Sequence, residues 1–235
     1  MKNKSLVIAK INFRNIKSAY IITAIVFGLI LVQDIVFIIL NVFGVDAGAG
    51  DGMTGIGNFL YLLVILSAIF IPSHNFRRIM NLGGKRDNYF SGCAVTYAIM
   101  AAAVSLAGII LYYTYENLLL AYYDGWTLNV LYWFGWIAGG PVIAFIRQVA
   151  FLFLLAVFTH TLTAVQDKWY GWAADILIVA IISVFPPIAP LRSSLVWFFY
   201  MIIFHPNAFL QITTCLILAA LIYWINRPIF ARKVI

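Results

Sequence analysis

The sequence has 235 residues, of which 64% are hydrophobic, 17% are aromatic and only 10% are charged. Its mean hydropathy is +0.99, whereas ordinary globular domains carry roughly 25% charged residues. A soluble chain could not keep this much apolar surface from water. The composition therefore excludes a soluble domain and predicts an all-α integral membrane protein.

The formal net charge of +7 would suit a nucleic-acid-binding protein, but the placement of the charges favours another explanation. Lys and Arg cluster beside apolar runs, as in loops that stay on the inner side of a membrane. We therefore expect contact with membrane lipid and no nucleic-acid partner. Cys93 and Cys215 lie in or beside apolar runs without metal-ligand spacing, so they predict buried thiols and no metal site.

Residues 1–18 form a basic segment with five positive charges and no acid. Apolar residues alternate irregularly with the cations, which favours an interfacial helix with its apolar side toward the membrane over a plain basic flank. No small-residue cleavage site follows the first apolar run, so we expect this segment to be retained.

Six apolar segments are predicted to cross the bilayer as helices, within a single transmembrane domain over residues 1–235. The expected spans are 19–42, 56–72, 90–113, 142–164, 172–185 and 208–225. Between the last two spans, Leu195 to Phe204 is apolar but too short to cross. Prolines precede this stretch, so we expect re-entrant helices there, on the outer side.

The aromatic stretch from Glu116 to Gly140 predicts an outer interfacial or re-entrant excursion. An alternative is a further crossing over Tyr132 to Ile146. That crossing would be broken by two glycines and a proline, Gly139 to Pro141, and would leave almost no turn before the next helix.

Charge asymmetry predicts the topology. With both termini and two turns in the cytoplasm, the inner side holds 13 of the 15 Lys and Arg residues. The outer segments hold the acids Asp46, Asp51, Glu116 and Asp124. Both termini are therefore expected on the cytoplasmic side of a cell membrane.

The turn over residues 73–89 joins the second and third spans and is strongly basic. Ser73 predicts the N-cap of a short helix and Asp87 a cap for the third span, while Gly83 and Gly84 predict a helix stop. Three apolar side chains share one face of this helix, which would meet lipid or a groove in a protein partner: Phe76, Ile79 and Met80.

The stretch FRRIMNLGGKRDNYFSG, from Phe76 to Gly92, resembles the corresponding turn in small Gram-positive permeases of type-2 ATP-binding-cassette (ABC) exporters. The order of surface helix, six spans and re-entrant pair is similar to that family over the whole chain, although the excursion after Glu116 is longer than usual. The resemblance implies that residues 73–89 form a coupling helix docked on an ATPase, with an elbow helix before the first span. The implied ATPase contacts are Phe76, Arg77, Arg78, Ile79, Met80 and Leu82.

The same resemblance implies an ATP-driven exporter of a bacterial plasma membrane. Two permease copies, or this chain and a paralogue, would carry an amphipathic or hydrophobic peptide, antimicrobial, lipid or drug. The chain lacks G-x-x-x-x-G-K-[ST], so ATP and Mg²⁺ would belong to the partner ATPase and no cofactor is expected here. The competing functions are a non-transport scaffold or sensor subunit and an intramembrane enzyme, although no catalytic set stands out.

A few polar residues interrupt the spans. Asp34 lies deep in the first span beside Gln33, where a charge costs about 3 kcal/mol. It predicts either a translocation path, with Arg147 as a partner, or a span that ends earlier. Arg147 favours snorkelling to the interface, and His160 favours a hydrogen-bonded packing role over a proton relay. The candidate path residues are Gln33, Asp34, Arg147 and His160.

Overall fold

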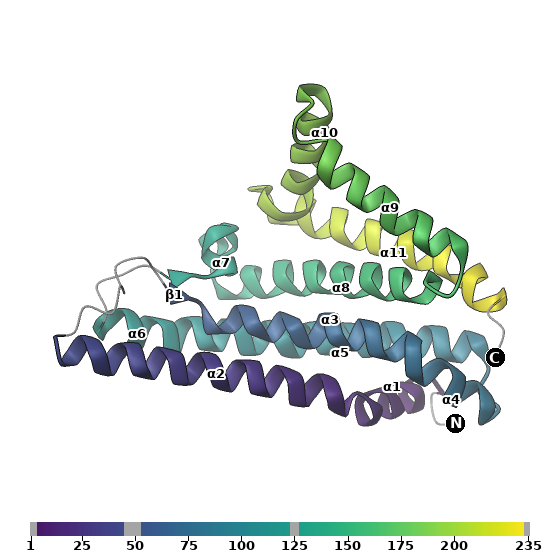
Figure 1. The fold of residues 1–235 in the computed structure, drawn as a ribbon, viewed down its shortest axis with the longest axis horizontal. Helices are drawn as coiled ribbons and strands as arrows, with labels where there is room; N and C mark the ends of the chain where they lie inside the picture. The colour runs from purple at the N-terminus through teal and green to yellow at the C-terminus, as the bar shows by residue number, and fades with distance from the viewer. Residues whose placement is uncertain (1–3, 45–52, 123–126, 233–235) are drawn as a thin grey trace.

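The computed structural model describes residues 4–44, 53–122 and 127–232. It is 88% helical, and Figure 1 shows long helices running side by side along the longest axis of the molecule. Five helices in this part are long and apolar enough to cross a membrane, or six if one bent pair counts as a span. The prediction of a helical, multi-pass membrane protein is confirmed at this level. Asp46, Asp51 and Asp124 lie outside the described residues.

The helices in the five candidate spans are α2 (Lys17–Val42), α3 (Tyr61–Phe70, part of the longer run Ile56–Asn81), α5 (Arg86–Leu111), α8 (Pro141–Val165) and α11 (Ala208–Arg232). The other helices are α1 (Lys4–Asn15), α4 (Phe76–Asn81), α6 (Asn117–Tyr122), α7 (Val130–Trp133), α9 (Trp169–Val184) and α10 (Ala189–Phe199). Two short parallel strands, β1 (Met53–Thr54) and β2 (Thr127–Leu128), pair with each other.

Two ends of the helix bundle can be distinguished in Figure 1. We call the end that holds α1, α4 and the last turns of α11 the basic end. The opposite end, which holds β1, β2 and α7, is the strand end. Helices prevail between the two ends because each satisfies its own backbone hydrogen bonds, which an apolar medium cannot do.

The second span and the basic turn form one continuous helical run. α3 passes through a π turn (Ile71–Asn75) into α4, so Pro72 does not end the helix as predicted. Ser73 is not an N-cap either, because its hydroxyl donates to the carbonyl oxygens of Ile69 at 2.8 Å and Phe70 at 3.2 Å. Proline has no N–H to donate and clashes with the preceding turn. The wider π turn relieves that clash. The Ser73 hydroxyl donates to the two carbonyl oxygens in place of backbone N–H groups.

The third span is longer than the predicted range 90–113. α5 continues through a π turn (Tyr112–Glu116) into α6, and the apolar helical run covers 35 residues, Arg86–Leu120. At about 1.5 Å per residue it is about 50 Å long, against a bilayer core of about 30 Å. The run is therefore longer than a bilayer core is thick.

Residues 127–140 contain no helix long enough to span a membrane. They hold β2, the four-residue α7 and a 3₁₀ turn (Trp136–Gly139). Gly135 and Gly140 have φ angles of +68° and +85°, a region that favours glycine and breaks the helix on both sides of the turn. The alternative crossing over Tyr132 to Ile146 is therefore wrong. The segment instead folds onto the bundle, with Trp136 fully buried.

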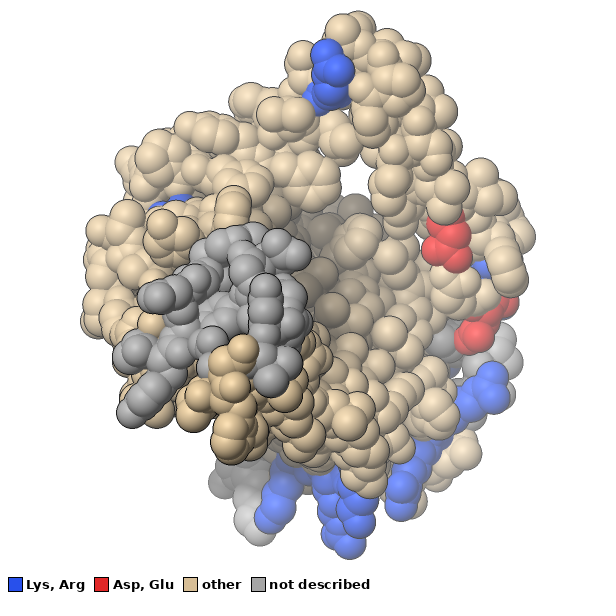
Figure 2. All heavy atoms as spheres, turned by 60° about the vertical axis from the view of Figure 1, so that its left-hand side comes forward, with Lys and Arg blue, Asp and Glu red and all other residues tan. Residues whose placement is uncertain are grey.

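α9 and α10 form an arm that leans away from the other helices (Figure 1). α10 continues through a π turn to Phe204, and the two halves of the arm meet at a bend of 112°. Gly171 is the only buried residue of α9, and α10 has none. Figure 2 shows an open gap between the upper lobe, at the height of α10, and the body of the molecule.

Candidate partner-docking surface

One face of α4 packs against the chain itself. Phe76, Ile79 and Met80 are 0%, 4% and 8% exposed. The rings of Phe76 and Tyr89 meet edge to face with centroids 5.3 Å apart, and the Tyr89 hydroxyl donates to the Ile71 carbonyl oxygen at 3.0 Å. These contacts correct the expectation that this face meets lipid or a partner, because its three apolar side chains complete the core beneath α4.

The opposite face of α4 and the turn after it point outward. Leu82 is 77% exposed, which is unusual for an apolar side chain surrounded by cations. An exposed apolar residue within a charged rim is typical of a contact site for another protein. We call the exposed residues of this surface the α4 knob: Arg77, Arg78, Asn81, Leu82 and Lys85.

A glycine pair fixes the shape of the α4 knob. Gly83 has φ +78°, and its N–H donates to the Met80 carbonyl oxygen at 2.9 Å, while the Gly84 N–H donates to that of Ile79 at 3.0 Å. A Cβ on Gly84 would lie 2.6 Å from Ile79 Cγ2. The predicted helix stop at these glycines is confirmed, and it determines where Leu82 and Lys85 project.

α1 packs on the side of α5 next to the α4 knob. Ile8 lies against Gly92 so closely that a Cβ there would be 2.6 Å from Ile8 Cγ2. The hydroxyls of Ser5 and Ser91 share a hydrogen bond of 2.7 Å. One face of α1, with Ile8 and Ala9, is therefore in contact with protein, whereas the apolar side chains of Leu6 and Val7 are 54% and 44% exposed.

A buried polar junction joins α1, α5 and the turn before α4. The Asn12 amide donates to Thr96 Oγ1 at 3.2 Å and lies 3.8 Å from Cys93 Sγ. Its carbonyl oxygen accepts from Asn75 Nδ2 at 3.2 Å. The Asn12 amide keeps both its donor and its acceptor partners only when all three segments are in place, so the base of the α4 knob is braced by α1 and α5.

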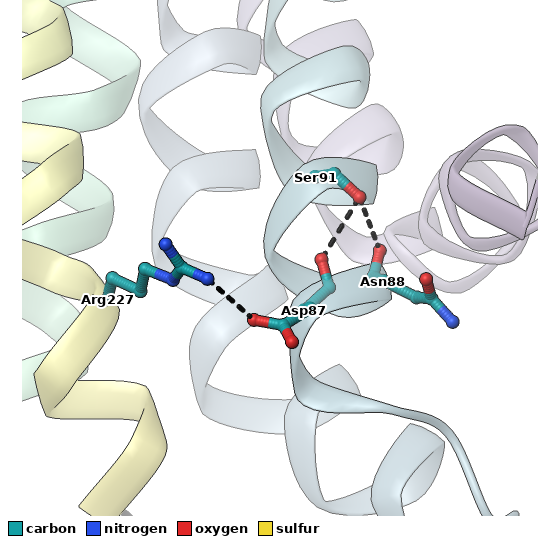
Figure 3. Close-up of polar contacts among 4 residues, drawn as sticks. All are labelled: Asp87, Asn88, Ser91 and Arg227. Carbon is teal, nitrogen blue, oxygen red and sulfur yellow. Dashed lines mark hydrogen bonds and ion pairs between the residues drawn. The ribbon is translucent and has the colours of Figure 1, made fainter.

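The start of α5 also contacts α11 at the basic end (Figure 3). Arg227 and Asp87 form an ion pair of 3.6 Å with side chains 63% and 82% exposed, and an exposed pair contributes about 0–1 kcal/mol. The prediction that Asp87 is the N-cap of α5 is wrong. The N-cap position is held by Lys85, and Asp87 lies in the first turn, where its charge suits the helix dipole. The Ser91 hydroxyl donates to the Asp87 carbonyl oxygen at 3.1 Å.

Positive charge dominates the surface around the α4 knob. Figure 2 shows Lys and Arg side chains gathered along the lower edge of the molecule, at the height that α1 and α4 occupy in Figure 1. The exposed cations on these elements and the adjoining turns are Lys4, Lys10, Arg14, Lys17, Arg77, Arg78 and Lys85. An acidic partner surface would complement them.

The candidate path residues do not meet in the structure. Asp34 is buried and accepts a hydrogen bond from the Tyr115 hydroxyl at 2.8 Å, so it is not paired with Arg147. Gln33 faces outward from α2. His160 is buried within 2.6 Å of the Tyr97 hydroxyl. It lies about 20 Å along α8 from Arg147, at about 1.5 Å per residue.

Arg147 does not snorkel to the interface, which corrects the interpretation that the sequence favoured. It is 3% exposed. Its Nε donates to Gln211 Oε1 at 2.7 Å and its Nη2 donates to the His205 carbonyl oxygen at 2.6 Å. Both acceptors belong to the junction between the arm and α11, so Arg147 connects α8 to that junction.

Two further side chains satisfy carbonyl groups at the same junction. Gln211 Nε2 donates to the Ile202 carbonyl oxygen at 3.0 Å, and Trp136 Nε1 donates to that of Ile203 at 2.8 Å. The last carbonyls of a helix have no partner inside it, and an apolar medium offers none. Arg147, Gln211 and Trp136 supply these partners, and we call the three the carbonyl clamp.

A second polar cluster, at the strand end, was not anticipated from the sequence. Glu116 Oε1 accepts from Asn129 Nδ2 at 2.6 Å, and a Cβ on Gly55 would lie 2.7 Å from the same oxygen. Asn58 donates to the Leu128 carbonyl oxygen at 2.7 Å and accepts from the Val130 N–H at 3.1 Å. The only signal was the presence of Asn and Glu beside apolar runs, which does not say which residues meet.

Comparisons with models of protein families, with curated proteins and with solved structures found no match for this chain. The function is therefore argued from the surfaces described above. Among them, the α4 knob combines an exposed apolar side chain, several cations and a braced base. Asp34, Arg147 and Asn12, by contrast, are buried and form hydrogen bonds that hold the chain's own segments together.

Proposed function

We propose that this chain is the membrane subunit of an ATP-driven exporter of the ABC type, and that the α4 knob docks on a cytosolic ATPase subunit. The observation that carries the proposal is the two-sided packing of α4. Phe76, Ile79 and Met80 fix it to the bundle, while Arg77, Arg78 and Leu82 remain exposed. A short helix that is fixed to the bundle on one side and exposed on the other would pass a push from a docked partner to the bundle.

Movement of the α4 knob would reach the spans directly. α4 continues into α3 without a loop, and the Phe76–Tyr89 contact rests it on α5. The Asn75–Asn12 hydrogen bond adds α1 to the same unit. Closure of the ATPase on ATP would therefore shift α1, α3 and α5 together, as a rigid-body movement rather than a loop rearrangement. ATP and Mg²⁺ belong to the ATPase in this mechanism.

The proposal places the basic end in the cytoplasm of a bacterial cell, with both termini on that side. The cations of α1 and the α4 knob support this orientation, because Lys and Arg are retained on the cytoplasmic side. The bent arm would then be a fifth crossing, α9, followed by re-entrant helices on the outer side, with α11 as the sixth crossing. The 112° bend between α9 and α10 fits a chain that crosses as α9 and then turns back at the outer side instead of continuing straight.

A second permease, either another copy of this chain or a paralogue, completes the proposed transporter. The arm leaves apolar side chains exposed along both of its halves, including Ile176, Val179 and Trp197. Asp34, Arg147 and His160 are occupied by hydrogen bonds within the chain, so a path between two chains fits better than one through a single chain. The apolar, aromatic outer region suits an amphipathic or hydrophobic cargo such as a peptide, an antimicrobial, a lipid or a drug.

The test is co-purification from the cell's own membranes with the chain tagged. We expect an ATPase that carries a nucleotide-binding motif to co-purify. Arg78→Glu and Leu82→Asp change exposed knob residues, and each should reduce the bound ATPase by about tenfold, the effect of about 1.4 kcal/mol. Arg192→Glu, an exposed residue of α10, is the matched control and should leave it unchanged.

Two results would contradict the proposal. One is an ATPase that stays bound to both knob variants, which would place the docking surface elsewhere. The other is a purified complex without any nucleotide-binding subunit, which would favour a scaffold, a sensor subunit or an intramembrane enzyme. Met80→Asp is not a suitable variant, because Met80 is buried and its replacement would disturb the fold.

A further inference from the structure

A stripe of cations that the α4 knob does not include runs from α1 to the start of α2. Lys10 and Arg14 are four residues apart, so they lie on one side of α1. Lys17 is the first residue of α2 and follows after the break at Ile16, and all three cations are exposed. The opposite side of α1 is packed on α5, so Lys10 and Arg14 face the surroundings.

The position of α1 along α5 places the stripe at the membrane boundary. α1 contacts α5 at Gly92 and Thr96, which lie about 9–15 Å from the start of α5 at about 1.5 Å per residue. The run that begins with α5 exceeds the bilayer core by about 20 Å, or about 10 Å at each end if it is centred. The contacts of α1 therefore lie at the edge of the hydrocarbon core, next to the headgroup layer.

The stripe continues into an apolar surface on α2. Lys17 opens an apolar span of 24 residues. At successive steps of four residues from it follow Ile21, Ile25 and Leu29, which are 59%, 57% and 64% exposed. Cations at the boundary followed by apolar side chains along the span match the two parts of a phospholipid, its charged headgroup and its acyl chains.

We propose that α1 and α2 form a binding site for an anionic phospholipid, with its phosphate on Lys10, Arg14 and Lys17 and its acyl chains along the outward face of α2. Charge complementarity selects the lipid. The ion pair between Asp87 and Arg227 at this end does not include a cation of the stripe. A lipid with net negative charge complements these cations, whereas zwitterionic phosphatidylcholine does not. This site does not depend on the proposed transport function.

The experiment uses the full chain in phosphatidylcholine nanodiscs at low salt. Trace spin-labelled phosphatidylglycerol and phosphatidylcholine are compared by the fraction of each lipid immobilised at the protein. A cation in contact with the headgroup layer contributes about a fivefold preference for anionic lipid, so the wild-type ratio should be about five or more. The triple variant Lys10→Gln, Arg14→Gln and Lys17→Gln should bring the ratio close to one.

The matched control removes three cations from the α4 knob instead, with Arg77→Gln, Arg78→Gln and Lys85→Gln. It should retain the wild-type ratio, and all three proteins should melt at similar temperatures in phosphatidylcholine. An equal loss in both triple variants would show that the overall charge of this end, not a site, attracts the lipid. Such a loss would overturn the proposal, as would a wild-type ratio near one.

A competition experiment distinguishes binding of a whole phospholipid from binding of a soluble phosphate compound. Glycerophosphoglycerol, which is the free headgroup, and inorganic phosphate should not displace labelled phosphatidylglycerol at millimolar concentration. Displacement by either would show a soluble-anion site and contradict the assignment to a lipid. If the α1 triple variant keeps its lipid preference but loses a co-purifying ATPase, the stripe is a protein contact and the lipid proposal fails.

Discussion

The two glycines after α4 carry different constraints, and Gly84 is the more sensitive to substitution. A Cβ there would lie 2.6 Å from Ile79 Cγ2 and 2.7 Å from the Ile79 carbonyl oxygen. Gly84→Ala should therefore destabilise the protein by about 1–3 kcal/mol and shift the α4 knob. The measurement is thermal unfolding in detergent.

The control for Gly84→Ala is Gly28→Ala in α2, where a Cβ would meet nothing within 4 Å. Alanine is a better helix former than glycine, so this variant should be as stable as the wild type or slightly more so. Equal stability of Gly84→Ala and Gly28→Ala would mean that the turn after α4 is loose, which contradicts the braced base of the α4 knob.

Arg147 is the residue of the carbonyl clamp with the largest expected effect. Arg147→Met preserves much of the apolar stem but leaves Gln211 Oε1 and the His205 carbonyl oxygen without the donors they have now. A single hydrogen bond between membrane helices contributes about 0.6 kcal/mol on average. A buried acceptor that is left without a donor costs about 1–3 kcal/mol. We expect a loss of about 1–3 kcal/mol in unfolding free energy, measured by denaturant titration.

Arg192→Met provides the comparison for this variant, since Arg192 is exposed on α10 and should change stability by less than about 0.5 kcal/mol. If Arg147→Met were as stable as Arg192→Met, Arg147 would not be holding the junction of the arm and α11. Its buried charge would then need a different explanation, such as contact with a translocated molecule.

At the scale of elements, the docking of α1 rests on Asn12. Asn12→Leu removes the donor to Thr96 and the acceptor for Asn75, and it places an apolar side chain among polar groups. We expect α1 to open locally, so that hydrogen exchange of its backbone amides becomes at least about tenfold faster, equivalent to about 1.4 kcal/mol. Amides in the middle of α8 should exchange as in the wild type.

The exposed Lys10→Gln variant serves as the control for α1. It alters the same helix without touching the buried junction, so amide exchange in α1 should stay unchanged. Faster exchange in both variants would indicate that α1 is held by its surface charges. Unchanged exchange in Asn12→Leu would indicate that apolar packing at Ile8 and Gly92 is sufficient.

The sequence predicted which segments are helical and apolar more successfully than how those segments end. Long apolar runs fix the spans, because the bilayer leaves the backbone few alternatives. The second span was predicted to end at Pro72, because a proline normally ends a helix. In the structure a π turn and the Ser73 hydroxyl allow the helix to continue. The third span was predicted too short because Tyr112 to Glu116 is polar enough to resemble a boundary.

The candidate site was predictable in its location but not in its orientation. The basic composition of residues 73–89 identified the surface, and Gly83 and Gly84 identified its turn. The sequence could not show that Phe76, Ile79 and Met80 face inward, because an apolar face fits a partner, lipid or the chain's own core equally well. The partners of Asp34 and Arg147 were also unpredictable, because they come from distant segments that only the fold brings together.

At the scale of the whole molecule, the exposed arm predicts a partner within the membrane. If the proposed transporter is correct, native mass spectrometry of the purified complex should give two permease chains and two ATPase chains. The physical reason is that α9 and α10 bury almost nothing within one chain. A complex with one permease chain would mean that lipid alone covers the arm.

If the proposed function is correct, the α4 knob is the cytoplasmic surface on which an ATPase docks. Photo-crosslinking in intact cells from a photoreactive amino acid at position 82, with position 192 as the control, examines this contact in place. Leu82 is exposed in the α4 knob, and Arg192 is exposed on α10. We expect position 82, but not 192, to be crosslinked to a protein with a nucleotide-binding motif, identified by mass spectrometry. Crosslinks from position 82 only to lipid, or to a protein outside the cytoplasm, would show that the α4 knob does not dock on an ATPase.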